Sequence, residues 1–191
     1  MRGFIDIGAN LAQEYFAEPN RDQIEWMFFE PQRSVFNEMC KKLILPKDNI
    51  KVFNFALGDK TGEVEMFVAK YNDCQSSSIL PPKIHLTQYP GIVFDSKEIV
   101  KIDKLDNIKY DKSLYDSMHI DTQGTELHVL QGAIESIKYI NEITVEVNRA
   151  ELYEGCPMIE DITAFLLTHG FSLHSVDWMG NTWGDALYLK R

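Results

Sequence analysis

The sequence predicts an α/β protein with a doubly wound, mostly parallel sheet. Short apolar runs alternate with segments whose apolar residues recur at helical spacing, and right-handed crossovers between parallel strands place such helices on both faces of a sheet. The 191-residue chain is 45% hydrophobic and 25% charged, as globular domains are. At roughly 100 to 200 residues per domain, a single domain over residues 1–191 is expected.

The amino-terminal half is expected to alternate strictly between strand and helix. Gly8 ends the first strand, Pro19 stops the first helix and Pro31 follows the second strand. Val35 and Met39 are four residues apart, as on one face of the second helix. The expected elements are strands over residues 4–7, 24–29 and 50–57 and helices over 12–16 and 34–45.

The carboxy-terminal half repeats this alternation and then departs from it. Gly170 marks the end of the last helix, and the two final strands are close enough in sequence to form an antiparallel hairpin at the edge of the sheet. Residues 70–90 contain several prolines and polar residues and predict a long loop, which is often functional. The expected elements are strands over 117–120, 143–147, 171–176 and 186–189 and helices over 126–137 and 159–167.

Charge and cysteine usage exclude several classes of partner and site. The 29 acidic and 19 basic residues give a net charge of -10, which disfavours nucleic acid and anionic membranes. Three widely spaced cysteines without a C-x-x-C pair favour a reducing compartment, the cytoplasm. No stretch is long enough for a membrane span, the first residues lack a signal-peptide core, and no histidine spacing indicates a metal site.

The sharpest local motif is FIDIGAN, which runs from the first strand into a turn. Gly8 lets a backbone approach a ligand, and the helix that follows offers unpaired N–H groups. A dinucleotide motif would need glycine at Asn10 and Gln13. Glu30 ends the next strand, where a carboxylate can accept both hydroxyls of a ribose. Asp6 and Glu30 therefore favour an adenosine-like ligand, although a turn cap and a solvated carboxylate are the plainer interpretations.

A series of motifs resembles the FkbM family of S-adenosylmethionine-dependent methyltransferases over nearly the whole chain. IDTQGTE is its most specific part, whereas the opening motif is shared more widely among class I methyltransferases. The family usually has glycine at Ala12 and more often lysine at His119. The matching segments are FIDIGAN, FFEP, residues 54–59 with Gly62, residues 104–106, and HIDTQGTE with Leu130 and Gly132.

The resemblance implies a seven-stranded Rossmann-like sheet whose last strand is antiparallel, and S-adenosylmethionine as the cofactor. It implies that the methionine part of the cofactor is contacted by Asp6, Gly8 and Asn10 of the opening motif. It further implies that Glu30 of FFEP holds the ribose, and that Ala56 and Leu57 flank the adenine. The implied activity is O-methylation of a small hydroxylated acceptor such as a sugar or glycan. A non-catalytic cofactor-binding or assembly module of the same fold is the alternative.

The catalytic candidates are Asp121, His119 and Glu146, which lie at or near the ends of the fourth and fifth strands. An acceptor hydroxyl needs a base, and His119 shares a strand face with Asp121. The alternatives are a helix cap for Asp121, a packed histidine, and a Glu146–Arg149 pair. A divalent cation held by Asp121, Glu146 and Asn148 is less favoured, so no metal is predicted.

Acceptor contacts are expected from the long loop, because little sequence precedes the first strand and no amino-terminal cap is expected. Ser76, Ser77 and Ser78 are the candidate substrate-binding residues, with a solvated polar loop as the alternative. Trp178 and Trp183 could stack on a sugar or pack at the sheet edge. A neighbouring subunit is another source of acceptor contacts, which leaves a homo-oligomer open.

Overall fold

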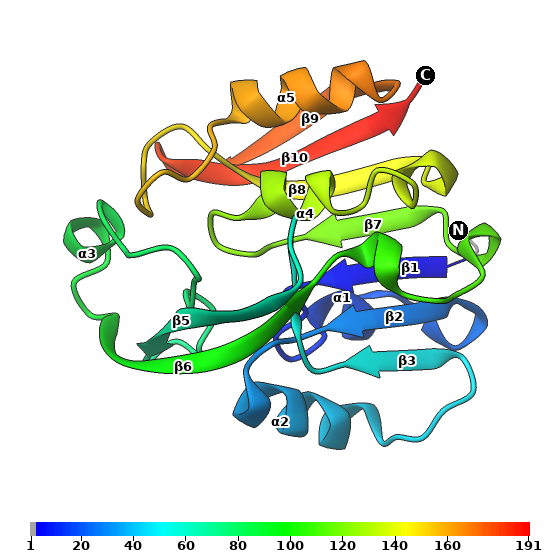
Figure 1. The fold of residues 1–191 in the computed structure, drawn as a ribbon, viewed down its shortest axis with the longest axis horizontal. Coiled ribbons are helices and arrows are strands. Elements are labelled where there is room, and N and C mark those ends of the chain that lie inside the picture. The colour runs from blue at the N-terminus through cyan, green and yellow to red at the C-terminus, as the bar shows by residue number, and fades with distance from the viewer. Residues whose placement is uncertain (1–2) are drawn as a thin grey trace.

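The computed structural model describes residues 3–191, so Met1 and Arg2, which begin the stretch expected to lack a signal-peptide core, lie outside the described residues. A seven-stranded sheet has the order β3-β2-β1-β7-β8-β10-β9 (Figure 1). Its strands are β1 (Gly3–Ile7), β2 (Glu25–Phe29), β3 (Ile50–Phe53), β7 (Ser117–Ile120), β8 (Glu142–Asn148), β9 (Phe171–Met179) and β10 (Trp183–Lys190).

The predicted mostly parallel sheet is confirmed. Strands β3, β2, β1, β7 and β8 run parallel to one another, whereas β10 is antiparallel to both β8 and β9. The terminal hairpin therefore forms as expected. Its second strand inserts beside β8, so the first strand of the hairpin, β9, becomes the edge of the sheet.

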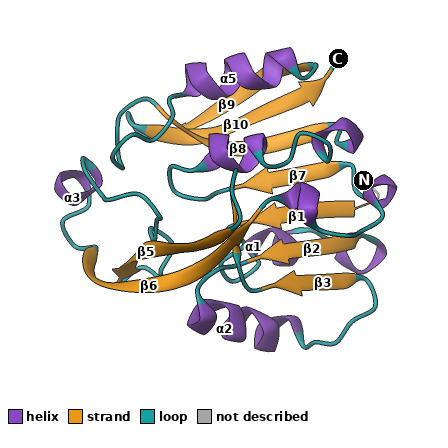
Figure 2. Ribbon diagram, in the orientation of Figure 1, coloured by secondary structure: helices purple, strands orange, loops and turns teal. Residues whose placement is uncertain are grey.

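Helices cover both faces of this sheet (Figure 2), with α4 and α5 on one side. The α-helices are α1 (Gln13–Ala17), α2 (Arg33–Leu43), α3 (His85–Gln88), α4 (Glu126–Gln131) and α5 (Ile159–Thr168), and short 3-10 turns lie at Arg21–Gln23, Leu105–Asn107, Lys112–Leu114 and Ile137–Tyr139. The predicted helix over 126–137 is too long. Helix α4 ends at Gly132, where the chain passes close to Gly58. A Cβ atom on Gly132 would lie 1.9 Å from the carbonyl oxygen of Gly58.

A second, three-stranded sheet was not predicted. It has the order β4-β6-β5, formed by β4 (Ala56–Leu57), β5 (Gly62–Lys70) and β6 (Val93–Asp103). The predicted strand over 50–57 is wrong in extent. It divides at Asn54, whose side-chain amide donates to the carbonyl oxygens of Glu30 and Pro31, so that β4 leaves the main sheet.

The small sheet and α3 lie on the side toward which the arrowheads of β1, β2, β3 and β7 point (Figure 1). This is the side of the carboxyl ends of the parallel strands, where open α/β sheets bind their ligands. Lys70 ends β5, and the rest of the predicted loop over 70–90 runs along this side with the short helix α3 and isolated β-bridges at Ser78 and Pro82. The fold thus places the segment between β5 and β6 over the strand ends.

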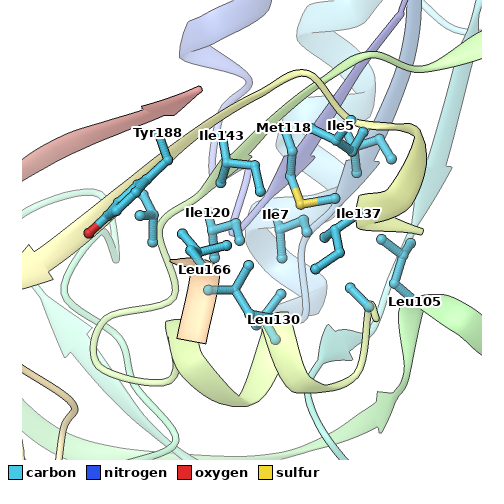
Figure 3. Packing of buried hydrophobic residues seen from close by; sticks show 14 of the residues in the cluster. Ile5, Ile7, Leu105, Met118, Ile120, Leu130, Ile137, Ile143, Leu166 and Tyr188 are labelled. Atoms are coloured by element: carbon cyan, nitrogen blue, oxygen red, sulfur yellow. The ribbon is translucent and has the colours of Figure 1, made fainter. Parts of the chain in front are cut away.

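Two apolar cores lie on opposite faces of the main sheet. Ile5 and Ile7 belong to the larger core under α4 and α5 (Figure 3), whereas Phe4 packs with the core that includes Tyr15 and Met39 of α1 and α2. The side chains of a strand alternate between faces, so Asp6 lies on the same side as Phe4. Burial of both cores fixes the strand register and hence the position of this carboxylate.

No helix among residues 3–191 is long and apolar enough to cross a lipid bilayer.

Candidate functional site

Two adjoining cavities lie at the carboxyl ends of the parallel strands. The narrow cavity is lined by Gly8, Glu30, Ala56, Leu57, Cys74 and Asp121, among others. The wide cavity has a volume of about 460 Å³ and is lined by Asp6, His119, Asp121, Glu146, Trp183 and Asp185, among others. The residues shared by both cavities are Gly8, Asn10, Gln75, Asp121 and Gln123. A ligand that fills the narrow cavity therefore borders directly on one in the wide cavity.

The turn after β1 forms the floor between the two cavities. Gly8 has φ +82°, and a Cβ atom on it would lie 1.8 Å from the carbonyl oxygen of Asp121. The N–H groups of Gly8 and Ala9 both donate to the carbonyl oxygen of Phe29. Ala12, where the resembled family usually has glycine, is fully buried with φ +60°. An alanine in this left-handed conformation costs roughly 1 to 2 kcal/mol relative to a right-handed one, yet the turn forms.

The buried Asp6 and the half-buried His119 form an ion pair beside this turn. His119 Nδ1 lies 2.9 Å from Asp6 Oδ1, and the two residues are directly paired between β1 and β7. Burial opposes protonation of His119, but the hydrogen bond and charge of Asp6 outweigh it and raise its pKa to about 9. Asp6 Oδ2 is buried and has no hydrogen-bond partner among residues 3–191. Asp6 therefore keeps one oxygen free next to the wide cavity.

Glu30 lies in the narrow cavity at the end of β2. Its carboxylate accepts hydrogen bonds from the backbone N–H of Asn10 at 3.1 Å and of Gln32 at 2.8 Å. Burial raises its pKa to about 8 in spite of these two donors. Ala56 and Leu57 line the same cavity. The structure thus brings together Glu30 and the pair expected to flank adenine.

Asp121 and Glu146 meet at the border of the two cavities. The side-chain amide nitrogen of Gln123 donates to Asp121 Oδ1 at 2.7 Å and to Glu146 Oε2 at 2.8 Å. Burial raises the pKa of Asp121, and burial together with the charge of Asp121 raises the pKa of Glu146 well above its usual range. All three catalytic candidates, Asp121, Glu146 and His119, line the wide cavity.

Glu126 is a buried carboxylate that sequence reasoning did not single out. Its Oε1 accepts hydrogen bonds from the Thr122 N–H, the Thr122 hydroxyl and the Gly124 N–H. Burial raises its pKa to about 7. It shapes the loop that carries Asp121 and Gln123. Its position at the start of α4, after a loop rich in small and polar residues, is the sequence signal that could have indicated this role.

The three serines lie near the cavities in different ways. Ser77 lines the narrow cavity and Ser76 the wide one. Ser78 is fully buried and lines neither. Its hydroxyl donates to the carbonyl oxygen of Gln123 at 2.6 Å and accepts from the N–H of Leu80, so its side chain is engaged within the fold and its role as a substrate contact stays a prediction. Ser78 anchors the loop after β7.

The contacts of Arg149, Trp178 and Trp183 bear on two further expectations, the Glu146–Arg149 ion pair and the placement of the two tryptophans. The guanidinium of Arg149 lies over the ring of Trp178 at 3.4 Å, while Glu146 bonds to Gln123, so the Glu146–Arg149 pair is wrong. Trp178 packs against the main core, and Trp183 lines the wide cavity and donates from Nε1 to the Tyr89 hydroxyl at 2.7 Å.

A cation site is another use that the carboxylates could have. Asp121, Glu126 and Glu146 each place one oxygen within 4.8 Å of the others, and the buried amide of Asn148 has no hydrogen-bond partner among the described residues. However, the Gln123 amide nitrogen already donates to Asp121 and Glu146. A donor directed at both oxygens disfavours a positive ion between them, and the arrangement fits a shared proton better.

Comparison with known proteins gives a family match. The family model described as the methyltransferase FkbM domain matches residues 6–173. A curated relative, the 2-O-methyltransferase NoeI of Sinorhizobium fredii, is 30% identical over 161 residues, which are 79% of this chain and 65% of that protein. The chain therefore spans just under two thirds of the length of this relative.

Solved structures share the fold. A candidate tRNA (m1A22) methyltransferase of Streptococcus pneumoniae in complex with S-adenosyl-L-methionine aligns with a TM-score of 0.53 and 13% identity, covering 98% of this chain and 65% of that one. Magnesium protoporphyrin IX methyltransferase of Synechocystis PCC 6803 aligns with a TM-score of 0.52 and 9% identity, covering 98% and 69%. At these identities the likeness concerns the fold alone.

Proposed function

Because the chain belongs to the methyltransferase FkbM domain family, we propose that it is an S-adenosylmethionine-dependent O-methyltransferase acting on a small hydroxylated acceptor such as a sugar or glycan. The observation that carries the proposal is the direct contact between two cavities of different character. The narrow cavity holds Glu30 beside Ala56 and Leu57, and the wide cavity collects Asp121, Glu146 and His119. Asp121 lines both and thus borders donor and acceptor alike.

The residues of the narrow cavity and the turn fit the proposed cofactor. Glu30 would accept the ribose hydroxyls, and Ala56 and Leu57 would flank adenine. The orphaned Asp6 Oδ2 would accept from the α-amino group, and Gly8 and Asn10 would lie against the methionine part. When bound, S-adenosylmethionine supplies a methyl group on a positively charged sulfur, ready for in-line displacement. The protein aligns the acceptor oxygen with that methyl group and accepts the hydroxyl proton.

Two features support an acceptor of the sugar class. Trp183 and Tyr89 give the wide cavity an aromatic wall, and Ser76 and Gln75 add polar groups on its loop side. The relative NoeI is a 2-O-methyltransferase, which supports oxygen as the accepting atom.

The carboxylates that line the acceptor side have no evident use in the binding-only module left open by the sequence. We place the protein in the cytoplasm, consistent with its three free cysteines.

Cofactor binding is the first test, with S-adenosylhomocysteine as the probe in calorimetry. Binding is expected, and Glu30→Ala should lower the affinity at least about fivefold, because it removes the acceptor of hydrogen bonds from the ribose hydroxyls. Glu98→Ala is the matched control, since Glu98 accepts a backbone N–H of α2 from outside both cavities. Failure of the folded wild type to bind would refute the proposed cofactor. Unchanged affinity in Glu30→Ala would remove Glu30 from the site.

The charge of the wide cavity predicts which acceptors are rejected. Its acidic residues are Asp6, Glu14, Asp121, Glu146 and Asp185, and no lysine or arginine of the described chain lines it. Juxtaposed like charges cost several kcal/mol at a binding surface. A neutral glycoside should therefore be methylated with a kcat/KM at least about 100-fold above that of its phosphate monoester. Methyl release from matched glycosides measures this ratio, and equal rates would contradict the acidic acceptor site.

A further inference from the structure

Gln123 connects the two carboxyl groups at the border of the cavities. Its amide nitrogen has two hydrogens, and one oxygen each of Asp121 and Glu146 lies within 2.8 Å of it. Its amide oxygen lies 2.8 Å from the hydroxyl of Tyr153, whose single hydrogen can go to this oxygen or to the carbonyl oxygen of Ser76, also at 2.8 Å. A flipped amide would direct its oxygen at the oxygens of both carboxyl groups. The two carboxyl groups, rather than Tyr153, therefore favour this orientation of Gln123.

The backbone around Gln123 is strained and firmly held. Gln123 has φ +54° and Gly124 has φ +102°. The hydroxyl of Ser78 donates to the carbonyl oxygen of Gln123, and Glu126 accepts from the Gly124 N–H. Left-handed non-glycine residues persist only where their surroundings enforce them, and such strain is concentrated at functional sites. The loop is thus built to hold one side chain in one place.

Asp121 and Glu146 also lie close to each other. Each places one carboxyl oxygen within 4.8 Å of the other, and Gln123 Nε2 bridges the two groups. Two carboxyl groups held this close are stabilised when one of them carries a proton. We propose that Asp121 and Glu146 share one proton and act together as the proton acceptor of the reaction, with Gln123 as the positioning residue. This inference rests on the proposed function and names the base that the sequence left open.

The charge balance of the transfer favours one proton on the pair. Two carboxylates this close, Asp121 half-buried and Glu146 buried, cannot both ionise readily, so the pair carries a single negative charge. As the acceptor oxygen bonds to the methyl carbon, the sulfur–methyl bond breaks and its electron pair stays on sulfur. The hydroxyl proton moves to the ionised oxygen of the pair. The positive charge on sulfur and the negative charge of the pair disappear in the same step.

The neighbours of the pair define its surroundings. Glu126 at the start of α4 and Asp185 of β10 raise the pKa of Glu146, and Asp6 of β1 raises that of Asp121, while His119 of β7 lowers it. His119 itself is a poor base near neutral pH, because its ion pair with Asp6 keeps it protonated. The proton therefore goes to the carboxyl pair.

Carboxyl-carbon nuclear magnetic resonance of the acceptor-free protein tests the shared proton. The Asp121 and Glu146 resonances of the wild type should titrate together in two steps. In Gln123→Met, which keeps the length of the side chain and removes both donors, the steps should move up by about one pH unit. Gln131→Met, at an exposed position at the end of α4, is the control. Independent single-step titrations, or steps that Gln123→Met leaves in place, would overturn the proposal.

A second variant keeps the test decisive if Gln123→Met does not fold. In Glu146→Gln, the like charge next to Asp121 is gone, so the pKa of Asp121 should fall toward its usual range, and an unmoved pKa would refute the pair. Calorimetry with S-adenosylhomocysteine on the same samples separates the two hypotheses. If the wild type does not bind S-adenosylhomocysteine, the proposed function is refuted. The titration of Asp121 and Glu146 then still tests whether the two carboxyl groups share a proton. Once a glycoside that the protein methylates is identified, its pH–rate profile gives a further test. The acidic limb of the profile should move up by about one pH unit in Gln123→Met.

Discussion

Replacing Gly8 by alanine should lower the free energy of unfolding by about 3 kcal/mol or more and abolish measurable S-adenosylhomocysteine binding. The new Cβ atom would lie 1.8 Å from the carbonyl oxygen of Asp121, so β1 and the loop after β7 must move apart. Overpacking of this kind costs roughly 1 to 3 kcal/mol, and the left-handed backbone adds roughly 1 to 2 kcal/mol for a residue with a Cβ atom. Chemical denaturation and calorimetry measure the two effects.

Gly155→Ala is the matched control for the steric part. Gly155 also has a left-handed backbone, at φ +71°, but no heavy atom lies within 4 Å of the position that a Cβ atom would take there. This substitution should cost only about 1 kcal/mol and leave cofactor binding intact. Equal destabilisation in the two variants would show that the approach of Gly8 to Asp121 does not limit the fold.

Asp121→Asn should lower kcat for methyl transfer at least about 100-fold, the usual range for loss of a general base. Asparagine keeps the size of the side chain, and its oxygen can still accept from Gln123, so the change is mainly the loss of a proton-accepting oxygen. The backbone N–H of Asp121, which donates to the Ile7 carbonyl oxygen, is unaffected. Steady-state kinetics with a neutral glycoside measure the effect.

Asp177→Asn is the control for Asp121→Asn, because Asp177 is an exposed aspartate of β9 that lines neither cavity. It should leave kcat within about twofold. If Asp121→Asn retained wild-type kcat and His119→Gln did not, the proton acceptor would be the histidine.

The main sheet could be predicted because its strands are short, apolar and separated by strong breakers. Gly8 and Pro31 mark strand ends correctly, and the buried face of each strand leaves little freedom in register. The small sheet was missed although Val64 and Met66 alternate with Glu63 and Glu65 in β5. A long segment rich in prolines and serines follows it, and the pairing of β5 with β6 is non-local, which no local pattern reports.

The site was predicted unevenly for a physical reason. Motif spacing indicated Asp6, Glu30 and Asp121, because each follows from the position of a strand end. Gln123 and Glu126 act through contacts that the loop after β7 creates, and those contacts depend on left-handed backbone at Gln123. Ser78 looked like its neighbours in sequence, and only the fold distinguishes a hydroxyl that anchors backbone from one that lines a cavity.

The two sides of the wide cavity differ in how they can be redesigned. The side formed by the strand ends is tied to Gly8, Gln123 and the carboxyl pair, where substitutions disturb the scaffold. The opposite side includes Tyr89 and Ile92, which line the cavity and belong to none of the apolar cores. Libraries aimed at new acceptors belong at these two positions, since there the shape of the pocket can be varied with the chemistry left untouched.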